Sequence, residues 1–109
     1  MIKIAIFASG NGTNAQRIIE YFRDHPSIAV DMVLTNNDNA YVLERALSFK
    51  IPGIVFTHDE FYKTKMIPDL LEERMINLVI LAGFLWLIPR NLLDRYPNRI
   101  VNIHPALLP

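Results

Sequence analysis

Short apolar runs alternate with segments of helical periodicity along the whole chain. The runs are rich in β-branched and aromatic residues, which is typical of buried strands, and we expect strands at residues 2–8, 28–35, 51–57, 77–83 and 99–104. We expect helices at residues 14–25, 40–50, 59–76 and 89–96. In the third helix Pro68 is expected to be a break or a new first turn, and Pro89 suits the first position of the fourth.

This alternation predicts an α/β fold. Strands that are apolar on both faces indicate a Rossmann-like parallel sheet with helices on both faces. The chain has 109 residues and shows no repeat, low-complexity tract or linker, so we expect residues 1–109 to form a single domain.

Composition excludes several functional classes. Eleven basic residues balance eleven acidic ones, so the charge pattern of a nucleic-acid-binding protein is missing. The chain has no cysteine, and its three histidines lack metal-ligand spacing, which predicts no metal site. The apolar run at the N-terminus is too short to span a membrane and fits a buried strand better. We therefore expect a cytoplasmic protein with no membrane partner.

A parallel sheet of this kind binds ligands beyond the carboxyl ends of its strands. The candidate loops therefore follow Ala8, Thr35, Gly83 and His104.

The first of these loops, SGNGTNA at residues 9–15, contains Gly10 and Gly12. Glycines let a ligand approach the main chain, and the free N–H groups of a following helix carry the positive end of its dipole. The loop can therefore hold a phosphate, with Thr13 and Asn14 as further donors. A plain helix start capped by Asn or Thr is the alternative.

The same loop matches the loose dinucleotide fingerprint Gly10-x-Gly12-x-x-Ala15. That fingerprint also needs an acidic residue at the end of the second strand. Here the strand ends in Thr35 and two asparagines, with Asp38 a little beyond. A nucleotide- or dinucleotide-binding module without catalysis stays as the alternative function.

Asn102 and His104 occupy alternate positions of the last strand, so their side chains point to one face, about 7 Å apart. An amide can donate to a developing oxyanion, and an imidazole can move a proton near neutral pH. Two polar groups that merely close a strand are the alternative. Their place at a strand's carboxyl end favours a catalytic pair.

Three segments together carry a resemblance to a known family: SGNGTN at 9–14, LAGFLWLIP at 81–89 and NIHPALLP at 102–109. They resemble the folate-dependent formyltransferases, and the first segment is similar to the branch that acts on glycinamide ribonucleotide. The resemblance covers the whole chain and implies the formyltransferase fold, truncated before the family's C-terminal part.

The resemblance implies a role for each segment. Gly12, Thr13 and Asn14 would hold the phosphate of glycinamide ribonucleotide. The main chain of a second set would line the pocket of the co-substrate 10-formyltetrahydrofolate, namely Leu85, Trp86, Leu87 and Ile88. Asn102 would bind the formyl oxygen, and His104 would donate a proton to the tetrahedral intermediate.

The implied reaction is direct transfer of a formyl group to an amine, in purine biosynthesis, without a metal. The family's catalytic aspartate lies on a later loop, so we expect these 109 residues to be inactive alone. An uncovered fifth strand would be an apolar edge, which predicts self-association as a homodimer or a domain-swapped assembly.

Overall fold

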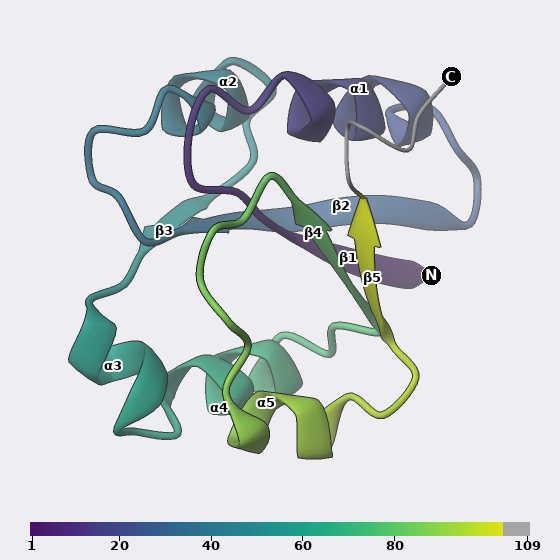
Figure 1. Ribbon diagram of the computed structural model, residues 1–109. Coiled ribbons are helices and arrows are strands. Elements are labelled where there is room, and N and C mark those ends of the chain that lie inside the picture. The colour runs from purple at the N-terminus through teal and green to yellow at the C-terminus, as the bar shows by residue number, and fades with distance from the viewer. Residues whose placement is uncertain (104–109) are drawn as a thin grey trace.

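Five parallel strands form one sheet in the order β3-β2-β1-β4-β5 in a computed structural model (Figure 1). The structure describes residues 1–103. The strands are β1 (Ile2–Phe7), β2 (Ile28–Thr35), β3 (Gly53–Val55), β4 (Leu78–Ala82) and β5 (Ile100–Ile103). The helices are α1 (Thr13–Phe22), α2 (Val42–Ser48), α3 (His58–Tyr62), α4 (Met66–Glu73) and α5 (Arg90–Arg95). The predicted fold class is confirmed.

Each predicted helix ends one to three residues earlier than the sequence predicts, and local conformation accounts for the ends of α1 and α2. α1 ends at Phe22 rather than at residue 25, and its last turn cannot extend through His25, which precedes a proline and disfavours helical backbone. The His25 Nδ1 atom instead accepts hydrogen bonds from the N–H groups of Ser27 and Ile28, at 3.0 and 3.1 Å. α2 ends at Ser48 because Lys50 adopts a left-handed conformation with φ of 61°.

The predicted helix at 59–76 is two helices, α3 and α4. The break precedes Pro68, which is the third residue of α4, where a missing N–H costs nothing. α3 begins with a capping box, in which Thr57 accepts from the Glu60 N–H and Glu60 accepts from the Thr57 N–H. Pro89 likewise precedes α5 as its N-cap instead of forming its first residue.

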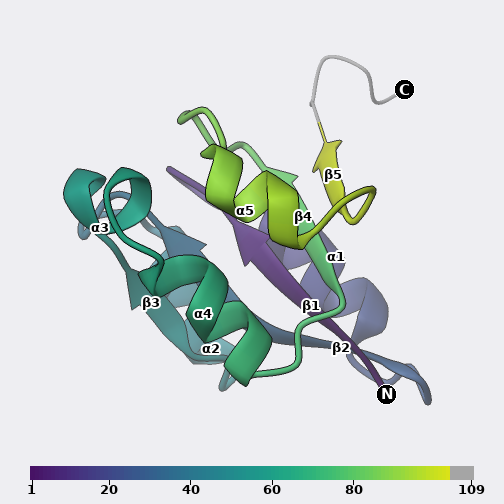
Figure 2. The same cartoon turned by 90° about the horizontal axis from the view of Figure 1, so that it is seen from below.

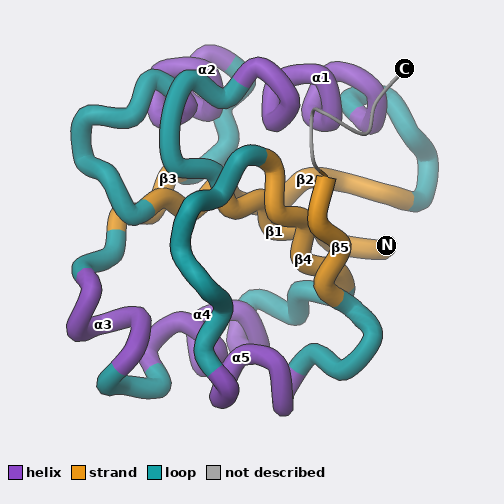
Figure 3. Tube along the Cα trace, in the orientation of Figure 1, coloured by secondary structure: helices purple, strands orange, loops and turns teal. Residues whose placement is uncertain are grey.

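The sheet has a separate apolar core on each face, beneath the helices that Figure 3 shows on its two sides. On one face Ile4 and Ile6 pack with Ala15 and Ile19 of α1 and with α2. On the other face Phe7 packs with residues of α3, α4 and α5. Alternate residues of β1 thus serve opposite cores, which explains why its sequence is apolar throughout.

The helices divide between the two faces in a way that creates an opening. The chain passes from β1 to α1 on one face and from β4 to α5 on the other (Figure 2). Because β1 and β4 are neighbours, the connections diverge between them. This point is the topological switch at which α/β sheets bind ligands.

Candidate functional site

The loops that follow β1 and β4 meet at the topological switch point. A small pocket of about 190 Å³ is lined there by residues 10–14 from the first loop and by Ala82 and Gly83 from the second. The sequence analysis placed its phosphate site in this first loop, and the structure adds the end of β4 as the opposite wall. We call residues Gly10–Asn14 the anion loop.

The anion loop lines the pocket and leads into the N-terminus of α1. Gly12 is the N-cap of α1, with φ of 79°, and among the described residues no side chain caps this helix end. The Asn or Thr cap that was the alternative interpretation is therefore not formed. Because the first N–H groups of a helix lack main-chain acceptors and carry its positive dipole, this end suits an anion.

Residues of helix α2 hold the anion loop in place through hydrogen bonds. The Val42 N–H donates to the Gly10 carbonyl at 3.1 Å. The Arg45 guanidinium donates to the Asn11 carbonyl at 2.6 Å, to the Asn11 side-chain oxygen at 3.1 Å and to Gln16. Sequence reasoning did not identify Arg45, because nothing in its local pattern distinguishes it from a surface arginine. Its positive charge adds to the potential at the loop.

The segment that follows β4, residues 84–88, alternates between inward and outward side chains. Phe84, Trp86 and Ile88 pack against the core, whereas Leu85 and Leu87 are exposed. The main chain of this segment is held at two atoms. The Leu85 N–H donates to the Ser9 hydroxyl at 2.9 Å, and the Tyr62 hydroxyl donates to the Leu87 carbonyl at 2.6 Å. We call residues 84–88 the β4 segment.

Trp86 belongs to an aromatic cluster that supports the β4 segment. Its ring centroid lies 5.3 Å from His58, 5.9 Å from Tyr62 and 6.0 Å from Phe56. Burial raises the pKa of the Tyr62 hydroxyl. Trp86 therefore has a packing role that the sequence left open. His58 is the first residue of α3, and its ring lies beside Trp86.

Asn102 lies on β5, directly beside β4, in register with Leu81. Ile100 and Leu81 both belong to the core beneath α3, α4 and α5. By strand alternation Asn102 shares that face of the sheet, which is also the face that carries the β4 segment. β5 is two strands from β1, so Asn102 lies about 10 Å sideways from the strand that leads into the anion loop. His104, its predicted partner, lies outside the described residues.

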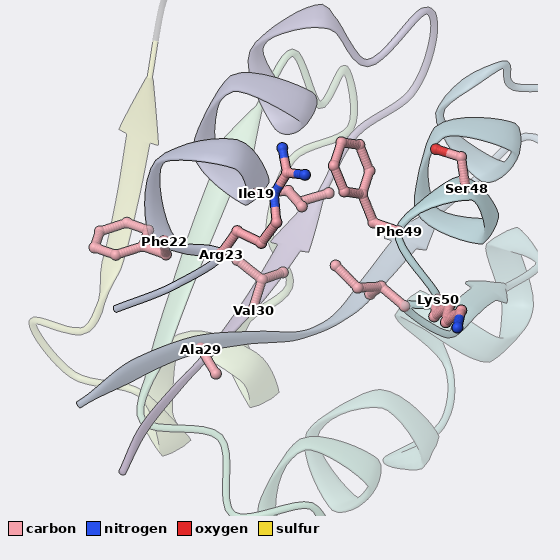
Figure 4. Close-up of a pocket in the computed structure, with 9 residues that line it drawn as sticks. Ile19, Phe22, Arg23, Ala29, Val30, Ser48, Phe49 and Lys50 are labelled. Atoms are coloured by element: carbon pink, nitrogen blue, oxygen red, sulfur yellow. The ribbon is translucent and has the colours of Figure 1, made fainter. Parts of the chain in front are cut away.

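The opposite edge of the sheet carries a larger pocket, of about 350 Å³ (Figure 4). It lies between the C-terminal ends of α1 and α2, and its lining includes Phe22, Arg23, Phe49 and Lys50. Helix C-termini carry partial negative charge, which Arg23 and Lys50 offset. This pocket lies at helix C-termini, so it lacks the free N–H groups of a helix N-terminus that the anion loop provides.

Within residues 1–103 no group of three or more potential metal ligands is present. None of the described helices is long and apolar enough to cross a membrane.

Comparison with known proteins matches residues 2–109 to the formyl transferase family. A phosphoribosylglycinamide formyltransferase of Haemophilus influenzae is 36% identical, aligned over 100% of this chain and 54% of its own length. The structure of the phosphoribosylglycinamide formyltransferase from Streptococcus pneumoniae is 43% identical, with a TM-score of 0.83 over 100% of this chain and 59% of its own.

A second solved structure, glycinamide ribonucleotide transformylase 1 from Symbiobacterium toebii, is 34% identical with a TM-score of 0.87, over 100% of this chain and 54% of its own. The chain spans about half the length of the curated relatives it matches. With the parallel sheet, the pocket at the switch point and a match over nearly every residue, the chain belongs to the formyl transferase family.

Proposed function

We propose that the chain forms the phosphate-binding and formyl-accepting half of a phosphoribosylglycinamide formyltransferase. The reaction would move a formyl group from 10-formyltetrahydrofolate to the amine of glycinamide ribonucleotide. The observation that carries the proposal is the pocket between the anion loop and the end of β4. It offers an anion site at the one place in this topology where two diverging loops leave room for a second substrate.

The two sides of the switch point would bind different parts of the reaction. The phosphate of the nucleotide would accept hydrogen bonds from the main chain at Gly12, Thr13 and Asn14. The folate would lie against the β4 segment, in which Leu85 and Leu87 are exposed. Trp86 and Ile88 would keep that main chain in place from the core side.

The chemistry would be a direct attack. The amine lone pair forms a bond to the formyl carbon, and the bond from that carbon to the folate nitrogen breaks. The amine loses one proton, and the folate nitrogen gains one. Negative charge collects on the formyl oxygen in the tetrahedral intermediate, so a donor at that oxygen lowers the barrier. Asn102 would supply this donor, and His104 would supply the proton.

The phosphate-binding part of the proposal is tested on the chain itself. We expect inorganic phosphate and glycinamide ribonucleotide to shift the amide resonances of Gly12, Thr13 and Asn14 in a ¹⁵N-labelled sample. NAD serves as the matched comparison. A response to NAD that is stronger than the response to glycinamide ribonucleotide would favour the dinucleotide-binding alternative.

The structure gives a reason to expect a weak response to NAD. The side chain that follows β2, where a dinucleotide fold places an acid for the ribose, is Asn36, and its Oδ1 atom accepts a hydrogen bond from Ser9 at 2.7 Å.

The catalytic part is tested in a chimera in which this chain replaces the matched half of the Haemophilus influenzae relative. We expect Asn102→Ala and His104→Ala each to lower the transfer rate by about 100-fold or more. Phosphate binding should persist in both variants, because neither residue lies in the anion loop. Full transfer activity in both would refute the catalytic assignment.

The folate part has a built-in probe, because Trp86 is the only tryptophan of the chain. We expect a non-reactive folate analogue to quench its fluorescence with a saturable dependence. Free tryptophan amide at the same absorbance controls for the inner-filter effect. A linear response that matches this control would place the folate elsewhere.

A further inference from the structure

The hydroxyl of Ser9 joins three loops at the carboxyl edge of the sheet. Ser9 follows β1, and its side chain donates to Asn36 Oδ1, beyond β2, at 2.7 Å. It also accepts from the Leu85 N–H, beyond β4, at 2.9 Å. The residue is 95% buried, since 5% of its surface is exposed. A buried hydroxyl with both a donor and an acceptor role filled has one fixed orientation.

Ser9 is tied to the β4 side by its main chain as well. Its N–H donates to the Gly83 carbonyl at 3.1 Å, and Gly83 lines the pocket with the anion loop. The side chain of Leu85 is 82% exposed, so packing does not fix this residue. The hydrogen bond to Ser9 therefore ties the Leu85 main chain directly to the residue that precedes the anion loop.

The far side of the anion loop is anchored to α2, through Val42 and Arg45. The loop thus has fixed contacts on the α1 and α2 face, and Ser9 carries the side-chain contact to the β4 segment. We propose that Ser9 is a positioning residue whose hydroxyl couples an anion in the loop to the main chain of the β4 segment. This inference rests on the proposed function, because it assigns the two segments to the two substrates.

A fixed link between the two binding segments would assist the transfer of a group between two bound molecules. The reacting amine and formyl carbon must meet at near-attack distance, and displacements on the order of 1 Å cost large factors in rate. One hydrogen-bonded residue between the two binding segments fixes their separation. An anion that restricts the motion of the Gly10 main chain would also restrict the motion of Leu85, because Ser9 joins the two segments. The phosphate site and the folate site would then bind with positive coupling.

The coupling is tested by titrating the ¹⁵N-labelled chain with inorganic phosphate. In the unaltered chain we expect shifts at Leu85 and Trp86 with the same midpoint as those at Gly12–Asn14. In Ser9→Ala we expect the shifts at Leu85 and Trp86 to fall by about fivefold while those at Gly12–Asn14 persist. Ser9→Thr, which keeps the hydroxyl, should restore them.

Tyr62→Phe is the matched control. It removes the other hydrogen bond that holds the β4 segment, at Leu87, and leaves Ser9 intact. The phosphate response at Leu85 should survive in this variant. If Tyr62→Phe abolishes the response as fully as Ser9→Ala does, the effect is general loosening of the segment and the coupling is refuted.

Each remaining outcome is decisive. Shifts at Gly12–Asn14 without any at Leu85 in the unaltered chain refute the coupling and leave the proposed function standing. No shift at either place refutes the anion site and the coupling with it. If Ser9→Ala does not fold, Ser9→Cys replaces it, because a thiol is a much weaker acceptor for the Leu85 N–H than the hydroxyl is. An unchanged response at Leu85 in that variant refutes the proposal, and a reduced one supports it.

Discussion

Gly12 lies so close to Val42 that a Cβ atom at position 12 would stand 2.9 Å from the Val42 Cα. Gly12 also has a left-handed conformation, with φ of 79°. The start of α1 and the start of α2 are therefore in direct contact at the anion loop, and two independent constraints require glycine there. Gly10 in the same loop has neither constraint, since a Cβ atom added there would meet no described atom within 4 Å and its φ is not positive.

We predict that Gly12→Ala destabilises the fold by about 2–4 kcal/mol, from left-handed strain together with overpacking. Phosphate binding should fall with it, because the loop must move away from Val42. Gly10→Ala is the matched control and should change stability by less than about 1 kcal/mol. Urea unfolding and a phosphate titration measure the two effects. An equal loss of stability in both variants would show that neither the left-handed conformation nor the contact with Val42 makes position 12 more sensitive than position 10.

Arg45 should support anion binding without contacting the anion. Arg45→Met removes a charge and the hydrogen bonds to Asn11 and Gln16. We expect phosphate affinity to fall by about fivefold, equivalent to about 1 kcal/mol, measured by calorimetry. Arg23→Met removes the same charge at the far end of α1 and should leave the affinity unchanged. A similar loss in both variants would mean that net charge alone matters.

The contribution of the α3 capping box to stability should be measurable through the aromatic cluster that contains Trp86. Thr57→Ala removes the side-chain acceptor for the Glu60 N–H and should cost about 1 kcal/mol. Glu60→Gln keeps the reciprocal hydrogen bond and should cost much less. Because His58 and Tyr62 of α3 pack on Trp86, tryptophan fluorescence during urea unfolding reports both variants. An equal loss of unfolding free energy in the two variants would argue that the reciprocal hydrogen bonds of the capping box do not stabilise α3.

Tyr96 should make the fold sensitive to high pH. Burial, and then the charge of Glu72, raise the pKa of its hydroxyl above the ordinary value, while Arg99 and Arg95 oppose the shift. The unfolded chain therefore loses this proton first as the pH rises through about 10, and stability falls from there until the folded pKa is passed. Stability from this group is complete below the unfolded pKa.

The Tyr96→Phe variant tests whether this hydroxyl causes the loss of stability at high pH. It loses the hydrogen bond that Tyr96 donates to the Ile76 carbonyl at 3.0 Å, which should cost about 1 kcal/mol at neutral pH. Its unfolding free energy should then decline less steeply between pH 9 and 11, roughly across the tyrosine titration range, than that of the unaltered chain. Parallel declines would show that other groups cause the alkaline loss.

β5 gives a test of self-association. Within residues 1–103 it pairs with β4 on one side only, and Val101 is 46% exposed. We propose that two copies associate through this edge, as the sequence predicts, and that Val101→Lys weakens the association. Leu47→Lys, at an exposed position of α2, is the control and should have no effect. A clean monomer at high concentration in sedimentation would refute the homodimer.

The fold class followed from the sequence because its cause is local and repeated. Strands such as Ile2–Phe7 are apolar at nearly every position, and burial on both faces of a parallel sheet satisfies that pattern. The carboxyl-edge location of the site follows from the same topology, and the glycine loop was visible because Gly12 must adopt a conformation that other residues resist. Helix ends were less predictable, since α1 and α2 end where His25 and Lys50 make local conformations that the periodicity does not encode.

The tertiary structure alone decided which distant residues complete the site. Arg45 lies 34 positions after Asn11, and Leu85 lies 76 positions after Ser9, so no spacing rule links either pair. Their contacts exist because parallel strands bring the loops after β1, β2 and β4 to one edge. The sequence by itself determined the sheet, its two apolar faces and the kind of loop that binds an anion. The packing of α2 behind that loop, and of Ser9 between the two binding segments, is a property of the assembled fold, because it depends on strand order and not on local pattern.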